Sequence, residues 1–245
     1  MIALLEWAPR QANERRSAVQ MEEDRILQMR VCRVRLRRGE RTPELLVRRR
    51  VDRALRRLQK LGITQVILPE AFSFSDALAR FGLKTVSTRA LRQALAADWV
   101  DSLLRGRAGA AVAVRANTLT GEAARTVTEL CLRWRYVLLD VPQGGEELGR
   151  ALRREYGVSL LLERAPERLA AADALVLFDP GLEIEGCGEK TVGLYDGGGP
   201  LPPVVLPPMI EEQLPAGADR GQLLSALRAS GSLRPGQMTV GRGRT

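Results

Sequence analysis

Three apolar runs in the second half of the chain, residues 110–116, 135–141 and 173–180, each end beside polar or glycine residues that could contact a ligand. The runs are continuously apolar, as is typical of parallel strands buried on both faces. Parallel strands place their carboxyl ends at one edge of the sheet, where open α/β sheets bind ligands. The candidate ligand-binding residues are therefore Arg115, Asn117, Asp140, Gly144, Gly145 and Asp179.

The chemistry available at such an edge is limited, because the sequence contains no histidine. Ser-His-Asp and Cys-His catalysis and histidine-ligated zinc are thereby excluded. The cysteines, Cys32, Cys131 and Cys187, are too widely spaced to indicate a disulfide framework or a cysteine zinc site. Cys131 is expected in the core, whereas Cys187 lies between two glycines and is expected in an exposed turn. The sequence assigns no catalytic residue and no metal site.

The glycine pair Gly144-Gly145 allows two interpretations. Backbone N–H groups at the start of a helix favour an anion, so the pair could cradle a phosphate. Glu146 and Glu147 follow directly, however, and acidic residues in the first turn interact with the helix dipole themselves and repel phosphate. No Lys-Ser/Thr pair completes a P-loop. The sequence favours a tight turn from strand to helix over a phosphate site.

Helices are expected between the apolar runs. Residues 120–134 and 144–157 have helical character, and residues 158–163 read as a further strand. Strands that alternate with helices indicate βαβ units and a parallel sheet. The candidate residues should therefore be held by the loops of an α/β domain.

Residues 108–180 resemble the first unit of an NAD(P)-binding Rossmann domain. In that family an acidic residue at the end of the second strand binds the adenosine ribose, and Asp140 occupies this position. The resemblance implies NAD(P) as cofactor. The loop after the first strand departs from the family pattern G-x-G-x-x-G, because it reads RANTLTG and contains only Gly121. Arg115 and Asn117 would intrude on the pyrophosphate position, so the resemblance is to a degenerate dinucleotide domain.

The expected fold class is therefore Rossmann-like α/β, with a mainly parallel sheet flanked by helices. We expect three parts: residues 1–106 form an N-terminal α/β half with a basic helix, and residues 107–181 form the Rossmann-like domain. Residues 182–245 supply a short β-hairpin within 182–199, a proline-rich connector over 200–215 and a short C-terminal helix. At the N-terminus, two strands within residues 1–38 are expected to pair as a hairpin around a polar loop or short helix.

The chain is strongly basic, with a net charge of +9, and only three of its 38 basic residues are lysines. This preference for arginine is typical of a GC-rich genome, and so part of the charge reflects codon usage. A predicted helix over residues 42–62 has one apolar stripe and one arginine-rich face. The face is either simply solvated, which the lack of interleaved aromatic residues favours, or binds nucleic acid. The candidate nucleic-acid-binding residues are Arg49, Arg50, Arg53, Arg56 and Arg57.

Good fold signals without catalytic ones favour a non-catalytic role in ligand binding, regulation or protein interaction. The alternatives are an NAD(P)-dependent oxidoreductase with a noncanonical loop and a nucleic-acid binder. The partner, a small molecule or a protein, is not specified by the sequence. No apolar run is long enough for a membrane span, and residues 1–9 lack the basic start of a signal peptide. We expect a cytoplasmic bacterial protein with a degenerate dinucleotide-binding-like domain.

Overall fold

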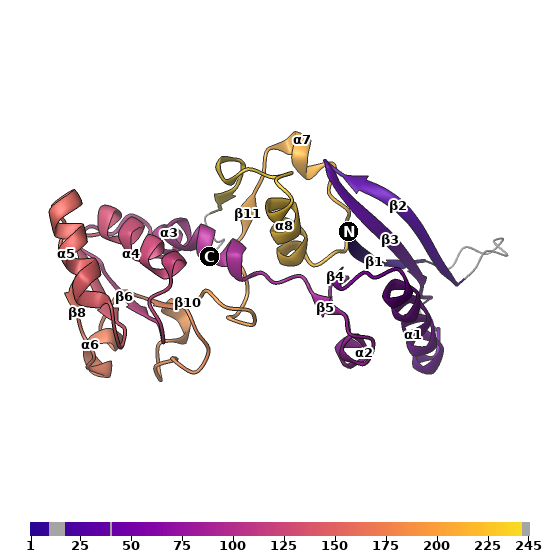
Figure 1. Ribbon diagram of the computed structural model, residues 1–245, viewed down its shortest axis with the longest axis horizontal. Coiled ribbons are helices and arrows are strands. Elements are labelled where there is room, and N and C mark those ends of the chain that lie inside the picture. Colours follow the sequence, from indigo (N-terminus) through magenta and orange to yellow (C-terminus); the bar gives the residue numbers. More distant parts are fainter. Residues whose placement is uncertain (10–17, 40, 242–245) are drawn as a thin grey trace. The chain divides into compact units, whose positions relative to one another are not determined.

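Two β-sheets, each of five strands, form the frame of the chain (Figure 1). The computed structural model describes residues 1–9, 18–39 and 41–241. Each sheet belongs to a separate unit, and both units are discontinuous in sequence. The first unit consists of Met1–Ser87 and Leu206–Gln237, and the second consists of Thr88–Val205 and the chain from Met238 onward.

The sheet of the first unit has the strand order β2-β3-β1-β4-β5. Strand β1 pairs in parallel with β3 and β4, β4 pairs in parallel with β5, and β2 is antiparallel to β3 at the edge. The strands are β1 (Ile2–Ala8), β2 (Val19–Ile26), β3 (Met29–Arg37), β4 (Gln65–Ile67) and β5 (Lys84–Thr85).

Helix α1 (Glu44–Lys60) covers one face of this sheet because it carries a continuous apolar stripe. Val47, Val51 and Leu58 of the stripe are buried against strand residues such as Val34 and Val66. Each such side chain contributes about 1.5–3 kcal/mol on burial. The remaining helices of the unit are α2 (Ser75–Arg80), α7 (Pro208–Glu211), α8 (Arg220–Ala229) and the 3₁₀ turn η2 (Pro235–Gln237).

The hairpin expected within residues 1–38 is wrong in its pairing, because β1 and β3 are parallel neighbours. The polar segment between them supplies β2, and the true hairpin is β2–β3. Ion pairs across this hairpin stabilise a strand that composition alone did not predict: Arg35–Glu22 at 3.0 Å and Arg33–Asp24 at 2.8 Å. Residues 10–17 of the expected loop lie outside the described residues.

The sheet of the second unit is entirely parallel, with the order β10-β9-β6-β7-β8. Read from β8, the strands follow the chain order third, second, first, fourth, fifth, which is the Rossmann arrangement. The predicted fold class is confirmed. The strands are β6 (Ala111–Arg115), β7 (Tyr136–Asp140), β8 (Leu161–Leu162), β9 (Ala174–Leu177) and β10 (Thr191–Gly193).

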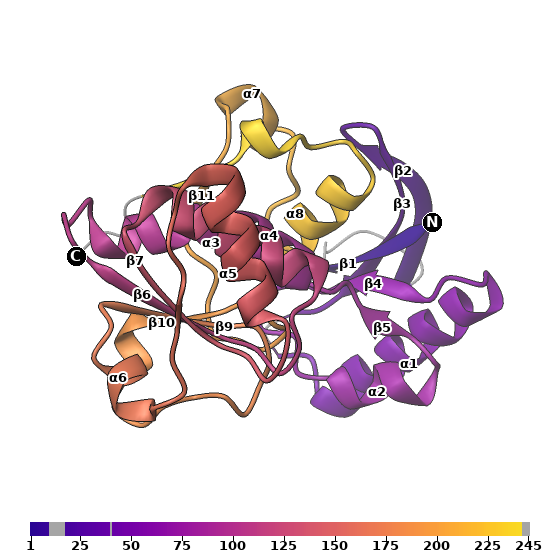
Figure 2. The same cartoon turned by 60° about the vertical axis from the view of Figure 1, so that its left-hand side comes forward.

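Helices cover both faces of this sheet (Figure 2). Helices α3 (Arg89–Leu104), α4 (Gly121–Arg133) and α5 (Gly145–Tyr156) lie on one face, over Val112, Val114 and Val176. Helix α6 (Pro166–Ala170) lies on the other, where Ala113 and Leu175 are buried. Alternate residues of each strand therefore enter different cores, which explains why the strands are apolar throughout.

The unit boundary falls at residues 87/88, whereas the sequence placed it at 106. The reason is α3, whose apolar residues Ala96, Val100 and Leu104 share one core with the Rossmann sheet. The last part is likewise divided, because residues 206–237 join the first unit and the segments before and after them join the second.

The hairpin expected within residues 182–199 is also wrong. The segment begins without a strand, forms the 3₁₀ turn η1 (Gly188–Lys190) and then adds β10 in parallel to β9. Cys187 is buried against α6 rather than exposed, because the turn folds back onto the sheet. The proline-rich segment is extended in its first part, which includes β11 (Val204–Val205), and β11 pairs antiparallel with β12 (Thr239–Val240). Its second part is not extended, because Pro208–Glu211 form α7. Among the described residues, no helix has the length and apolar character to span a bilayer.

Candidate functional site

Arg115 and Asp140 meet at the carboxyl edge of the second sheet, because β6 and β7 pair in register there. Arg115 Nε donates to Asp140 Oδ2 at 2.9 Å, and Arg115 Nη1 donates to the Leu182 carbonyl at 2.8 Å. Both charged side chains are about four-fifths buried. The carboxylate that would bind a ribose in a dinucleotide domain is thus held by a neighbouring guanidinium.

Asp179 is engaged in a similar way at the end of β9. Its Oδ2 accepts a hydrogen bond from the backbone N–H of Asn117 at 2.9 Å, and its Oδ1 lies 3.8 Å from Arg89 Nη2. The side chain of Asn117 itself is exposed. The crevice between β6 and β9, where the strand order reverses, therefore holds a protein carboxylate near the position of the first loop. A carboxylate there disfavours a bound pyrophosphate.

The start of α3 also bonds to this edge, which sequence reasoning missed. Thr88 donates to Asp196 through its backbone N–H at 2.7 Å and its hydroxyl at 3.0 Å. Arg92 is buried, and it donates to the carbonyls of Gly193 and Gly199 at 3.0 and 2.6 Å. An arginine within an otherwise apolar helix face was the signal in the sequence that could have revealed this contact.

The glycine pair is built into the turn and the packing around it. Gly144 is the N-cap of α5 with φ of 84°, a conformation that favours glycine. A Cβ at Gly144 would lie 3.1 Å from Leu119 Cδ2, and one at Gly145 would lie 2.8 Å from Leu162 Cδ2. Leu119 comes from the loop after β6, so the two loops that flank a Rossmann nucleotide site contact each other directly. These contacts favour the turn interpretation of the pair.

Other carboxylates near the edge are also bonded. Glu163 follows β8, and hydrogen bonds from the Ala165 N–H and from Arg168 hold its pKa below the usual range. The Tyr195 hydroxyl donates to Glu183 at 2.5 Å, which lowers the pKa of that carboxyl and raises the pKa of the phenol.

Burial raises the pKa of the Cys131 thiol to about 11, as fits its predicted place in the core. No group of three metal-ligating acidic or cysteine side chains forms within the described part of the chain.

The structure thus brings the predicted edge residues together, but it engages them with one another. Arg115 bonds to Asp140, Asp179 bonds to the backbone of Asn117, and the two glycines make a turn. Such an edge is suited to holding loops in place. Chemistry on a ligand would require these contacts to open.

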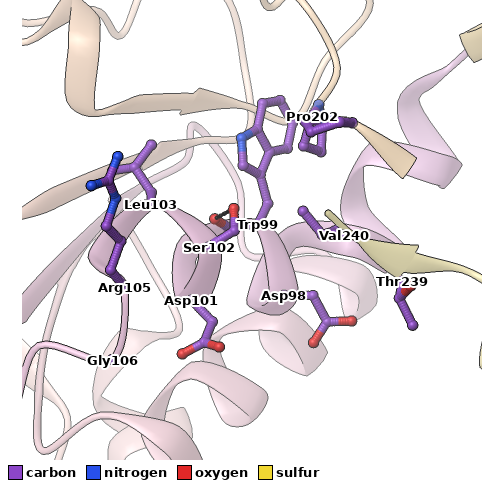
Figure 3. Close-up of a pocket in the computed structure, with 11 residues that line it drawn as sticks. Asp98, Trp99, Asp101, Ser102, Leu103, Arg105, Gly106, Pro202, Thr239 and Val240 are labelled. Atoms are coloured by element: carbon purple, nitrogen blue, oxygen red, sulfur yellow. Dashed lines mark hydrogen bonds between the residues drawn. The ribbon is translucent and has the colours of Figure 1, made fainter. Parts of the chain in front are cut away.

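A cavity of about 890 Å³ lies elsewhere in the second unit, along the C-terminal half of α3. Figure 3 shows the indole of Trp99 beside Pro202 in one part of this cavity, with Asp98 and Asp101 projecting away from the ring. Leu103 and Val240 add apolar surface. The cavity therefore has an aromatic, proline-lined part and an acidic part.

The two acids of the cavity differ in their partners. Asp98 Oδ1 accepts from Arg133 Nη1 at 2.6 Å. Asp101 is exposed, and no basic side chain of the described residues lies within 4 Å of its carboxylate. Arg105 also lines the cavity, at the end of α3 with φ of 51°. Sequence reasoning missed this site because its residues come from a helix, the proline-rich segment and β12.

The candidate nucleic-acid-binding arginines all lie on α1 in the first unit. Four of them, Arg49, Arg53, Arg56 and Arg57, are exposed, and Arg50 is half-buried. Arg50 Nη1 donates to the Arg37 carbonyl, and the Arg56 guanidinium lies 6.0 Å from the centre of the Phe81 ring. Among the described residues, no carboxylate lies within 4 Å of the five.

No protein-family model matches the sequence, and no curated protein matches it. Among solved structures, the chain is similar to an L-tryptophan dehydrogenase from Nostoc punctiforme (12% identity, TM-score 0.30, covering 66% of this chain and 50% of that chain). It is also similar to a shikimate dehydrogenase from Aquifex aeolicus (17%, 0.26, 63% and 61%) and to a probable ornithine cyclodeaminase from Bordetella pertussis Tohama I (24%, 0.28, 38% and 29%). The alignments thus cover less than two thirds of each of these structures. Similarity at these TM-scores carries no functional argument.

Proposed function

We propose that the chain is a non-catalytic binding protein, whose second unit keeps the Rossmann architecture and binds a small ligand in the cavity beside Trp99. The observation that carries this proposal is the contrast between the carboxyl edge of the second sheet and the cavity along α3. The charged side chains of the carboxyl edge are bonded to other groups of the protein, whereas Asp101 in the cavity along α3 has no basic side chain of the described residues within 4 Å.

The closed edge argues against the standard dinucleotide pose for two reasons. A ribose would have to compete with Arg115 for Asp140, and a pyrophosphate would have to approach the Asp179 carboxylate. Breaking a hydrogen bond to a charged group costs about 1.5–3 kcal/mol. Leu119 further fills the space between the two loops by its contact with Gly144.

The cavity has the size and composition of a small-molecule site. Ligand pockets typically occupy about 300–1,000 Å³ and combine apolar walls with a few polar groups. Here the walls are Trp99, Pro202 and Leu103. The polar lining includes the Asp101 carboxylate, which has no basic side chain of the described residues within 4 Å, and the Arg105 guanidinium. An organic cation with an apolar body fits this arrangement, because its charge would lie at the acidic part and its body against the indole.

The test uses 4-phenylbutylamine as the probe, with 4-phenylbutanol and 4-phenylbutyrate as neutral and anionic analogues. Isothermal titration calorimetry should give binding of the amine that Asp101→Asn weakens about tenfold, which corresponds to about 1.4 kcal/mol. Glu122→Gln is the matched control, since Glu122 is exposed on α4 and does not line the cavity. No binding of the amine, equal binding of the butyrate, or an unchanged affinity in Asp101→Asn would contradict the proposal.

A second candidate function, NAD(P)-dependent oxidoreduction, is favoured by one specific observation: Asp140 ends the second strand of a sheet with Rossmann order. Titration with NAD⁺ and NADPH distinguishes the two functions. If the chain is a non-catalytic binding protein, binding should not saturate at about 1 mM cofactor. A dissociation constant of about 1 mM corresponds to a binding free energy of only about −4 kcal/mol. Tighter binding that Asp140→Ala weakens would favour the oxidoreductase instead.

A further inference from the structure

Arginines that have no carboxylate within 4 Å among the described residues gather in one stretch of the first unit, from the end of β3 to the last turn of α1. Elsewhere in the described chain many arginines have a carboxylate within 4 Å, including Arg33, Arg107, Arg115 and Arg133. Among the residues of this stretch that the structure describes, Arg48 has one, Asp76. The arginines with no such partner among the described residues are Arg38, Arg41, Arg49, Arg50, Arg53, Arg56 and Arg57.

Three of these arginines line a cavity of about 580 Å³. Arg38 follows β3, Arg41 lies in the loop before α1, and Arg50 lies on α1 itself. No acidic residue lines this cavity within the described chain. Glu44, in the first turn of α1, is the nearest acid in sequence that the structure describes, and it is not part of the lining.

Local contacts position the residues that line this cavity. Thr42 Oγ1 accepts from the Gly39 N–H at 2.9 Å, and the Thr42 N–H donates to the Gly39 carbonyl at 3.0 Å, so these two lining residues are bonded to each other. The Arg38 guanidinium lies 5.1 Å from the centre of the Trp7 ring, which orients its head group. Arg50 Nη1 donates to the Arg37 carbonyl, which positions its side chain.

The basic surface continues from the cavity along α1. Arg50, Arg53 and Arg57 are spaced at i, i+3 and i+7, and therefore lie on one face of the helix. Arg49 borders the same stripe one turn before Arg53. The arginines from Arg49 to Arg57 span about 12 Å of α1, which is long enough to lie along several phosphates of one DNA strand, since each strand carries one negative charge about every 3.4 Å of the duplex axis.

We propose that this surface binds the phosphate backbone of nucleic acid, with one phosphate in the cavity of Arg38, Arg41 and Arg50 and further phosphates along α1. The length of the stripe favours an extended polyanion over a single small anion. Helix α1 has no aromatic residue to stack on bases, so the binding is independent of base sequence.

The experiment is fluorescence anisotropy with a labelled 20-base-pair duplex, at KCl concentrations from about 50 to 200 mM. The affinity should fall steeply with salt, with a slope of about −0.9 per phosphate contact. The combined variant Arg49→Gln, Arg53→Gln, Arg57→Gln should reduce the magnitude of the slope by about three and weaken low-salt binding at least about tenfold. Far-UV circular dichroism checks that each variant remains folded.

The matched control removes three charges from the second unit, through Arg125→Gln, Arg135→Gln and Arg153→Gln. These arginines are exposed, and no carboxylate of the described residues lies within 4 Å of them. Its affinity should stay within about twofold, apart from the small effect of net charge. An equal loss in this control would overturn the proposal, because binding would then follow total charge rather than this surface.

The double variant Arg38→Gln, Arg41→Gln tests the contribution of the cavity separately. One lost phosphate contact should lower the magnitude of the slope by about one. Addition of inorganic phosphate at constant ionic strength should leave the duplex bound. Displacement by inorganic phosphate would assign the cavity to a free anion and overturn the nucleic-acid assignment, as would salt-insensitive or absent duplex binding.

Discussion

The carboxyl edge of the second sheet and the basic surface of α1 are both rich in charge, but they use it in opposite ways. At the edge, Arg115 and Asp140 are about four-fifths buried and bonded to each other. On α1, Arg49, Arg53 and Arg57 are exposed and have no carboxylate within 4 Å among the described residues. At the carboxyl edge the charged side chains bond to other groups of the protein and hold loops together, whereas the guanidinium groups on α1 can contact a partner.

The difference shows why a charged residue at a strand end is a weak indicator of a ligand. Burial makes an unpaired charge costly, so a charge in a partly buried position acquires a partner from the protein itself. An exposed guanidinium does not need a partner from the protein, because water solvates its charge. Available charge is therefore expected on the solvent side of a helix rather than at a packed edge.

The largest effect on the free energy of unfolding should come from adding a side chain at Gly193, where two backbone segments of the carboxyl edge approach each other closely. A Cβ at Gly193 would lie 2.5 Å from the Gly198 carbonyl oxygen, so Gly193→Ala must displace backbone that Arg92 holds. We expect a loss of about 3 kcal/mol, measured by urea unfolding. Gly149→Ala lies inside α5, where a Cβ would lie 3.9 Å from Leu160 Cβ in ordinary contact, and it should instead stabilise by about 0.5–1 kcal/mol. Similar losses in both variants would contradict a tightly closed edge.

The ion pair at the edge should give the next largest effect. Asp140→Ala leaves Arg115 partly buried without its carboxylate, and should cost about 2 kcal/mol of unfolding free energy. A double-mutant cycle with Arg115→Ala isolates the coupling between the two side chains. A coupling energy near zero would mean that Asp140 is free for a ligand, and the contrast with α1 would then fail.

The smallest effect is expected on α1. Removing Arg49, Arg53 and Arg57 together as glutamines relieves like-charge repulsion at spacing i, i+4, so stability should rise by up to about 0.5 kcal/mol at low salt. The gain should disappear at about 1 M salt, where the screening length is about 3 Å. A clear loss of stability would show that these arginines stabilise the fold, and would contradict the contrast between α1 and the carboxyl edge.

The Rossmann-like sheet could be predicted because its strands are buried on both faces and its helices carry clear end signals. The short, continuous apolar runs around Val112 and Val176 alternate with helical segments, and this alternation indicates buried parallel strands. The parallel pairing of β1 with β3 was beyond reach, because it depends on β2, a polar strand whose ion pairs appear only after pairing. The hairpin expected within residues 182–199 was wrong because its glycines permit both a hairpin turn and the close backbone approach that Gly193 makes to Gly198.

The edge residues themselves were predicted from topology, whereas their engagement was not. Topology brings Arg115 and Asp140 to one edge, but nothing in the sequence states that they bond to each other. Arg92 and Thr88 were missed because they precede the domain by sequence and join it by packing. The cavity of Trp99 was missed because β12 returns to α3 from far along the chain.

That return has a consequence for synthesis on the ribosome. Strand β12 pairs with β11 only after the intervening residues 206–237 have been made, and those residues belong to the other unit. Neither unit can therefore complete its contacts while the chain is still growing through residue 205. We expect both units to reach their native form only after residues 206–240 have emerged from the ribosome, and a nascent chain stalled before β12 to remain sensitive to protease.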